Sequence, residues 1–253
     1  MRLSLKLFTG YNLFTAGLFI AANQVVTPQV LADWDATHPS DAPATKDPLA
    51  LSVASVYYEV IGTLSFALAA LPLFGEAAGP VAGCLATMGI MAKHITVNGL
   101  MPPPPVMGMV AITALLTLFA AVTGRKGGVG KWAFVIYNVL NAAVFILDPV
   151  TPLRDSFPAL QDGTHAMALG KIMFEVMGYC SYQLAAITLF DQSAAGYAVG
   201  FLPGLAMLYK HQTVDLVGPP MPVLVLFLLT NVLLAKDAVF GGGGAAGKGK
   251  KSE

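Results

Sequence analysis

Ionisable side chains inside apolar segments are the residues of this sequence most able to do chemistry. Placing a charged side chain at mid-membrane costs roughly 2.5–3.5 kcal/mol, so such a residue usually pairs, lines a polar pocket or serves a function. Seven candidate ligand-binding residues have this character: Glu59, Lys93, His94, Lys171, Glu175, Lys210 and His211. We predict that they form polar sites within the membrane.

Glutamate beside histidine is also the composition of a general acid–base pair. Glu59 with His94, and Glu175 with His211, are therefore the candidate catalytic residues. Purely structural interpretations stay open for the same residues. A lysine can extend to the headgroups, a neutral glutamic acid can be held by a tyrosine, and a buried pair can lock two helices together.

The residues recur because the sequence is an internal duplication. Gly79–Pro105 aligns without a gap on Gly196–Pro222, which places Lys93-His94 on Lys210-His211. Each copy opens with a Gly-x-x-x-Gly pair, which lets two membrane helices approach closely, and closes with a proline-rich turn. The spacing predicts two tandem repeats of about 120 residues each.

Composition places the chain among membrane proteins. Hydrophobic residues make up 56% and charged residues only 11%, with a mean hydropathy of +0.69. The net charge is zero, so nothing indicates a nucleic-acid partner. Cys84 and Cys180 do not match in the repeat alignment, which argues against a disulfide framework, and we predict no metal site.

Apolar segments of about the 20 residues that a bilayer requires predict the spans. They cover roughly 8–28, 51–74, 77–98, 105–123, 131–148, 166–190, 194–214 and 222–236. The predicted fold is an all-α polytopic membrane protein, in which eight transmembrane helices form two parallel four-helix repeats.

The predicted boundaries follow from these segments. A first repeat covers 1–124, a second covers 125–238, and 239–253 is a flexible basic cytosolic tail. Residues 29–49, with several aspartates and prolines, are predicted to be an acidic loop outside the membrane.

The loops predict an orientation. Loops on the side of the two termini are rich in lysine and arginine, whereas the opposite loops are rich in aspartate, so both termini are expected in the cytosol. Lysines at positions 250 and 251 resemble a dilysine signal for retrieval to the endoplasmic reticulum. A basic tail that meets anionic lipid is the alternative.

Depth along the helices predicts which side chains meet. At 1.5 Å per residue, Glu59 lies about 12 Å and His94 about 6 Å below the same non-cytosolic surface. Glu175 has the same relation to Lys210 and His211 in the second copy, and Lys171 precedes Glu175 by one helical turn.

Several short motifs resemble those of the DoxX-like family of four-helix membrane proteins. They are the turn at Thr27-Pro28, the run Glu59–Gly62, a third helix that ends near His94, and a fourth helix led by proline. The resemblance implies a four-helix fold for each copy. The family includes redox-associated bacterial subunits and, in a related branch, endoplasmic-reticulum assembly factors for ion channels, so it implies no single chemistry.

Three functions are compatible with these features. The first is a binding or assembly protein whose partners are membrane lipid, a quinone, a sterol or another lipophile, or other membrane proteins. The second is a membrane-embedded isomerase, cyclase or lipid oxidoreductase that uses the Glu/His pairs. The third is a proton-coupled transporter, which we rank last because few charged residues line the cytosolic half of the spans. The sequence indicates no particular cofactor.

Overall fold

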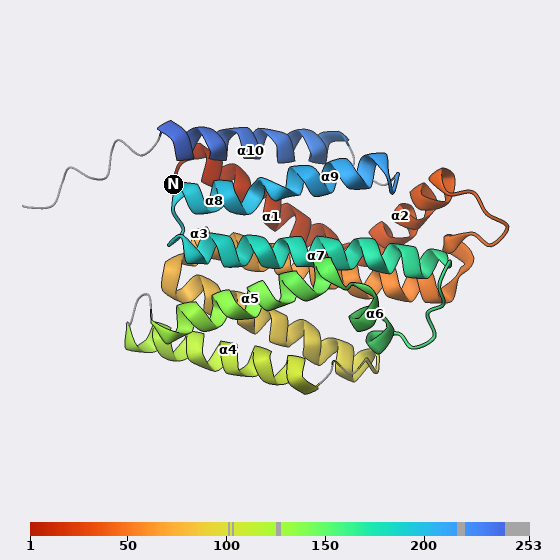
Figure 1. Cartoon of the computed structure of the whole chain (residues 1–253), viewed down its shortest axis with the longest axis horizontal. Helices are drawn as coiled ribbons and strands as arrows, with labels where there is room; N and C mark the ends of the chain where they lie inside the picture. The colour runs from red at the N-terminus through yellow and green to blue at the C-terminus, as the bar shows by residue number, and fades with distance from the viewer. Residues whose placement is uncertain (101, 103, 125–127, 217–220, 241–253) are drawn as a thin grey trace, which may run out of the picture.

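The computed structural model describes residues 1–100, 102, 104–124, 128–216 and 221–240, and within them the chain contains helices and turns but no β-strand (Figure 1). The elements are α1 Leu3–Ala21, α2 Asn23–Thr37, η1 Ala44–Lys46, α3 Pro48–Val97, α4 Pro104–Thr123, α5 Val129–Leu147, α6 Val150–Ser156, α7 His165–Leu189, α8 Ala194–Phe201, α9 Pro203–Thr213 and α10 Met221–Phe240. The prediction of an all-α chain is confirmed.

Six of the described helices are long and apolar enough to cross a membrane, judged by length and composition. They are α1, α3, α4, α5, α7 and residues 223–240 of α10. The most apolar part of α7 is 72% buried, whereas that of α4 is only 17% buried. An apolar helix with so little buried surface is suited to face lipid, so the chain is an integral membrane protein with α7 at its centre.

The 50 residues of α3 form two antiparallel arms that turn at Gly75. Gly75 has φ 77°, a left-handed conformation that glycine adopts without a steric penalty. The second arm folds back on the first: a Cβ on Gly79 would lie 2.8 Å from the Cα of Leu71, and one on Gly83 would lie 2.9 Å from the Cβ of Ala67. The Gly-x-x-x-Gly pair of the first copy therefore serves helix packing within the chain.

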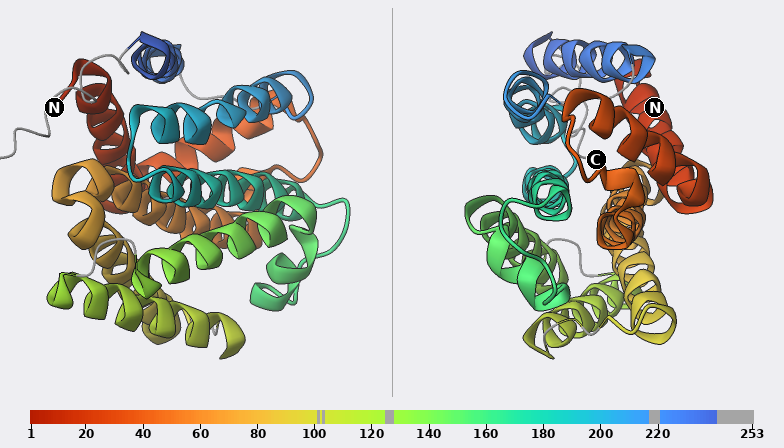
Figure 2. Two further views of the ribbon diagram at one scale, coloured as in Figure 1. Left: turned by 60° about the vertical axis from the view of Figure 1, so that its left-hand side comes forward. Right: turned by 90° about the vertical axis from the view of Figure 1, so that its right-hand side faces the viewer.

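The central layer consists of α3 and α7, which pack against each other. On one side α5 packs on α7, and α4 contacts both α5 and α3; on the other side α1 packs on α3, and α10 contacts both α1 and α8 (Figure 2). The start of the chain and the end of α10 lie at one end of the bundle, opposite α2 and α6 (Figure 1).

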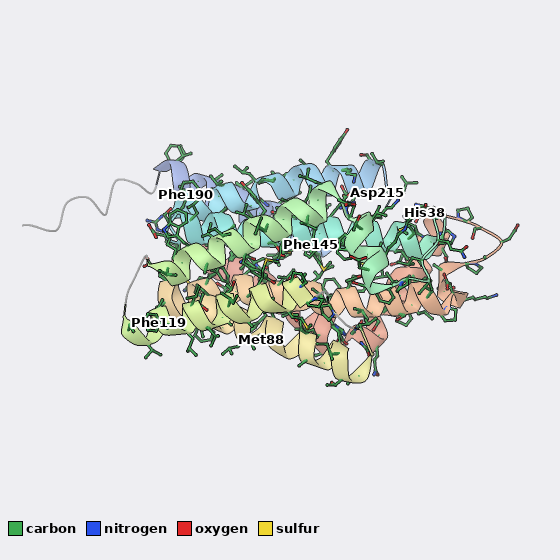
Figure 3. The ribbon with its side chains drawn as sticks, turned by 60° about the horizontal axis from the view of Figure 1, so that its bottom comes forward. His38, Met88, Phe119, Phe145, Phe190 and Asp215 are labelled. Carbon is green, nitrogen blue, oxygen red and sulfur yellow. The ribbon has the colours of Figure 1, made fainter. Side chains whose placement is uncertain are left out.

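The N-terminal part departs from the prediction. A helix over 8–28 followed by a loop over 29–49 is wrong: α1 ends at Ala21, and α2 continues to Thr37. Residues 29–37 of the acidic segment fold as helix because the apolar residues of this part pack into the core. Leu31 is fully buried, Trp34 is 4% exposed, and the Trp34 indole donates a hydrogen bond of 2.9 Å to Nδ1 of His165. His38 and Asp215 mark this end of the bundle in Figure 3, opposite Phe190.

The predicted span at 194–214 is a broken helix, in which α8 ends at Phe201 and α9 begins at Pro203. Proline lacks an N–H, so the carbonyl of Val199 loses its helical donor. The hydroxyl of Tyr182 in α7 lies 3.4 Å from that carbonyl oxygen and donates to it. A break at this depth is tolerated because neighbouring side chains replace the missing backbone hydrogen bonds.

Tyr179 stabilises the helix break at Pro203 most strongly, and removing its hydroxyl group tests this role. Its hydroxyl donates to the carbonyl oxygen of Phe201 at 2.7 Å and accepts from the Gln183 amide at 2.6 Å, all within the core. Tyr179→Phe leaves two buried polar groups unpaired, so we expect it to lower the free energy of unfolding by about 1–3 kcal/mol. Tyr182→Phe is the matched control and is expected to cost less, because Tyr182 is less buried and its hydrogen bond is longer, at 3.4 Å. Unfolding in detergent by added SDS measures both, and equal losses would contradict this account.

Candidate functional site

The first copy brings three of the predicted residues together. Nζ of Lys93 lies 2.6 Å from Oε1 and 2.7 Å from Oε2 of Glu59, and Nε2 of His94 lies 3.8 Å from Oε2. Glu59 stands on the first arm of α3, and Lys93-His94 stand on the second. The hairpin at Gly75 is therefore what brings the acid to its partners. We call Glu59, Lys93 and His94 the first cluster.

The second copy repeats this geometry on different elements. Nζ of Lys210 lies 2.6 Å and 2.5 Å from the two carboxylate oxygens of Glu175, and Nε2 of His211 lies 3.8 Å from Oε2. Glu175 belongs to α7, and Lys210-His211 belong to α9, beyond the break at Pro203. We call Glu175, Lys210 and His211 the second cluster.

Burial is graded in the same way in both clusters. The side chains of Glu59 and Glu175 are 11% and 21% exposed, and the histidine side chains are 7% and 8% exposed. The lysine side chains are 46% and 45% exposed. Acid and imidazole thus lie inside protein, while each lysine extends inward from the surface along its apolar stem. Both lysines are paired with a carboxylate in the structure, so neither simply extends to the headgroups.

Close helix packing one turn beyond each glutamate holds the clusters in place. A Cβ on Gly62 would lie 2.8 Å from Cγ1 of Ile20 in α1, and a Cβ on Gly178 would lie 2.7 Å from Cγ1 of Ile146 in α5. The absent side chain allows α1 to touch α3 and α5 to touch α7. The two glutamates therefore stand on helices whose positions are set by equivalent contacts.

An additional donor completes the first cluster. Nδ2 of Asn23, at the start of α2, donates to Oε1 of Glu59 at 3.0 Å and to the backbone oxygen of Ser55 at 2.9 Å. Sequence reasoning missed Asn23 because the break between α1 and α2 was not predicted. The only available signal was an amide side chain inside the predicted helix over 8–28.

Lys171 is not part of the second cluster. It is half-buried on α7 and makes no hydrogen bond or ion pair with any residue that the structure describes. The expectation that it would join Glu175 across one helical turn is therefore wrong. The lysine that contacts both carboxylate oxygens of Glu175 is Lys210, from α9.

The two histidines differ in their second ring nitrogen. Nδ1 of His94 lies 2.7 Å from Nδ2 of Asn98, whereas Nδ1 of His211 lies 2.6 Å from Oδ2 of Asp215. Asn98 and Asp215 occupy the same place in the repeat, one helical turn after the histidine. Sequence reasoning missed Asp215, although its spacing of four residues from His211 is visible in the sequence.

Nε2 of both histidines is an unsatisfied buried atom. Each nitrogen is shielded from solvent and has no hydrogen-bond partner among the described residues. The 3.8 Å that separates it from the carboxylate is too long for a hydrogen bond. A buried polar group without a partner costs about 1–3 kcal/mol, so a polar group entering either cluster would recover that energy.

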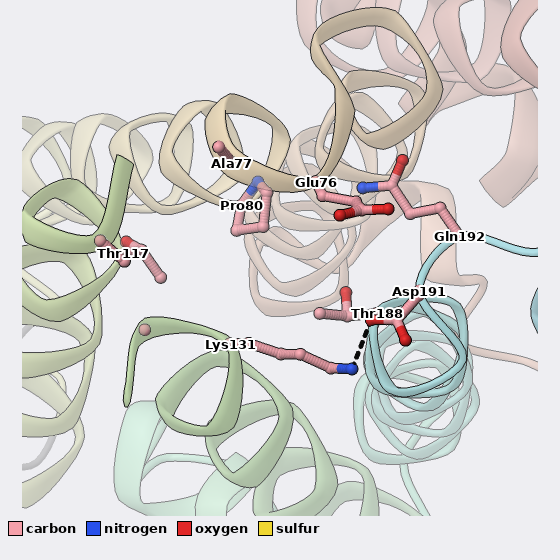
Figure 4. A pocket seen from close by; sticks show the side chains of 10 residues that line it. Glu76, Ala77, Pro80, Thr117, Lys131, Thr188, Asp191 and Gln192 are labelled. Atoms are coloured by element: carbon pink, nitrogen blue, oxygen red, sulfur yellow. Dashed lines mark hydrogen bonds and ion pairs between the residues drawn. The ribbon is translucent and has the colours of Figure 1, made fainter. Parts of the chain in front are cut away.

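Other polar features lie apart from the clusters. A cavity of about 40 Å³, enough for one or a few water molecules, lies near the turn at Gly75, where Lys131 pairs with Asp191 at 2.5 Å (Figure 4). Cys84 and Cys180 are free and buried. Across the described ranges, no three His, Cys, Asp or Glu side chains are grouped so that they could hold a metal ion.

The chain was compared with protein families, curated proteins and solved structures. No protein-family model, no curated protein and no solved structure matches this chain.

Proposed function

We propose that the chain crosses the membrane eight times, as two parallel four-helix repeats over 1–124 and 125–238. The first repeat consists of α1, the two arms of α3, and α4, and the second consists of α5, α7, the α8–α9 pair, and α10. The matched contacts of Gly62 and Gly178, together with the matched Glu–Lys–His distances, support this pairing. The repeated packing of α4 on α5 and of α10 on α1 also supports it.

Each repeat, in this proposal, binds the polar group of a lipophilic molecule, or of a client helix, at its Glu–Lys–His cluster. The observation that carries the proposal is the buried Nε2 of His94 and of His211, each without a partner in the described structure and each beside an ion pair. Unpaired buried donors or acceptors are rare in proteins, and the same one occurs here in both copies. An accessory or assembly role, in line with the DoxX-like resemblance, follows from binding without turnover.

The proposed orientation places both clusters in the non-cytosolic half of the bilayer. It rests on the basic loops beside the termini and on the aspartates of the opposite loops. Residence in the endoplasmic reticulum rests on Lys250 and Lys251, which lie outside the described residues together with the rest of 241–253. The beginning of the predicted tail, at residues 239–240, is instead the end of α10.

Lipid retention tests the binding proposal. The protein and its Glu59→Gln/Glu175→Gln variant are extracted from the same membranes into nanodiscs, and the retained lipophiles are identified by mass spectrometry. We expect at least one species to fall about tenfold in the variant, which corresponds to ~1.4 kcal/mol of lost binding. Glu76→Gln is the control, since Glu76 is an exposed carboxylate at the turn between the two arms of α3, away from Glu59. A lipid profile that is the same in all three proteins would refute the proposal.

A membrane-embedded enzyme is the second candidate, and one observation favours it. Asp215 contacts Nδ1 of His211, while Nε2 of the same ring is unpaired and points toward Glu175. A carboxylate that orients a histidine is a recurring arrangement for general base catalysis. The retained lipophile would then be converted by the wild-type protein, and His211→Gln would abolish the conversion while binding persists.

A further inference from the structure

Asn98 carries a side-chain amide where Asp215 carries a carboxylate. This difference decides which ring nitrogen of each histidine carries the proton. In the first cluster, the Asn98 amide nitrogen can only donate, so Nδ1 of His94, 2.7 Å away, must accept. The proton of the neutral ring then lies on Nε2. The buried nitrogen that faces Glu59 is therefore a hydrogen-bond donor.

The second cluster has the opposite arrangement. The Asp215 carboxylate can only accept, so Nδ1 of His211, 2.6 Å away, carries the proton. Lys210 contacts both oxygens of Glu175, so that carboxylate is already neutralised and does not require a charged imidazole. Nε2 of the neutral His211 ring is then a lone pair that can accept a hydrogen bond.

We infer that the two clusters have opposite hydrogen-bond polarity: the first binds an acceptor such as a carbonyl or ester oxygen, and the second binds a hydroxyl donor. This assignment of ligand chemistry rests on the proposed function, whereas the two tautomers rest on the contacts alone. A duplicated fold thus carries two different recognition sites.

Nitrogen NMR of the full-length protein labelled with ¹⁵N in its histidine rings tests the tautomers directly. Protonated and unprotonated ring nitrogens are well separated in chemical shift, and single His→Gln variants assign the four rings. We expect a proton on Nε2 of His94 and on Nδ1 of His211. The exchanged variants Asn98→Asp and Asp215→Asn are nearly isosteric, and each should reverse its own histidine only. His38 and His165, which belong to neither cluster, report whether the fold is retained.

Four NMR results would contradict the two tautomers. The same tautomer in both rings, an Nδ1 proton on His94, or a doubly protonated His211 would overturn the inference. So would variants that leave the tautomers unchanged while the signals of His38 and His165 show a native fold.

Two probes of equal shape test the ligand assignment in the same sample. One is a long-chain methyl ketone, which only accepts, and the other is the secondary alcohol of the same carbon skeleton, which also donates. We expect the ketone to shift Nε2 of His94 and to leave His211 unchanged, whereas the alcohol shifts Nε2 of His211. A ketone response at His211 as large as that at His94 overturns the assignment. If neither probe shifts either ring, the binding proposal itself fails, although the tautomers stand.

Discussion

Lys93→Met is expected to lower the free energy of unfolding by about 3 kcal/mol, the largest effect of any single substitution considered. The methionine keeps the length of the side chain but leaves the Glu59 carboxylate, only 11% exposed, without its counter-charge. Removing one partner of a buried ion pair typically costs 3–5 kcal/mol, and the lower end applies because Lys93 is itself half-exposed. Unfolding by SDS in detergent micelles, followed by tryptophan fluorescence, measures the loss.

The second copy supplies the matched comparison. Lys210→Met should cost less, because Glu175 is 21% exposed and Lys171, which has no ion-pair partner among the described residues, lies one helical turn away on the same helix. Lys171→Met alone should change stability little, whereas the Lys171→Met/Lys210→Met double variant should approach the loss seen for Lys93→Met. Additive single effects in the double variant would show that Lys171 does not substitute for Lys210.

Gly62→Ala and Gly178→Ala are expected to destabilise the protein by equal amounts, about 1–3 kcal/mol each. In either variant the new methyl group meets an isoleucine Cγ1 at less than 3 Å and a phenylalanine Cβ at 3.1 Å, so two closely packed helices must separate. The same unfolding titration measures both variants.

Gly89→Ala is the control for this pair. Gly89 lies in the second arm of α3, where an added Cβ has no neighbour within 4 Å among the described residues. Alanine there should be neutral or slightly stabilising, because alanine favours helix over glycine. A large difference between Gly62→Ala and Gly178→Ala would show that the two copies are not packed equivalently, and it would weaken the proposal of two matching repeats.

The equal geometry of the two clusters has a consequence for mechanism. Both present a carboxylate, an ammonium and an unpaired imidazole nitrogen within the protein, yet the residue behind the imidazole differs. In the binding function that we propose, such a difference changes which chemical group each cluster recognises without any change of fold. Duplicated membrane domains can therefore diverge in ligand while their packing contacts are retained.

The sequence alone determined the membrane character, the helical class and the residues that would meet. A charge within an apolar segment is costly, and this cost limits the positions that Glu59 and Lys93 can occupy to a shared depth and a shared contact. The recurrence of the same residues in the second copy then predicted the contact of Glu175 with Lys210. These predictions succeeded because they depend on hydrophobicity and helical rise, which are properties of the local chain.

The tertiary structure alone decided the rest. The break at Pro203 is possible because Tyr179 and Tyr182 on another helix donate to the freed carbonyls. Asn23 joins Glu59 because the chain breaks at Ala22, and the lysine that pairs with Glu175 is Lys210 from α9 rather than Lys171 from its own helix. Each outcome depends on which distant side chain occupies a given space, and no periodicity or residue spacing along the chain encodes that competition.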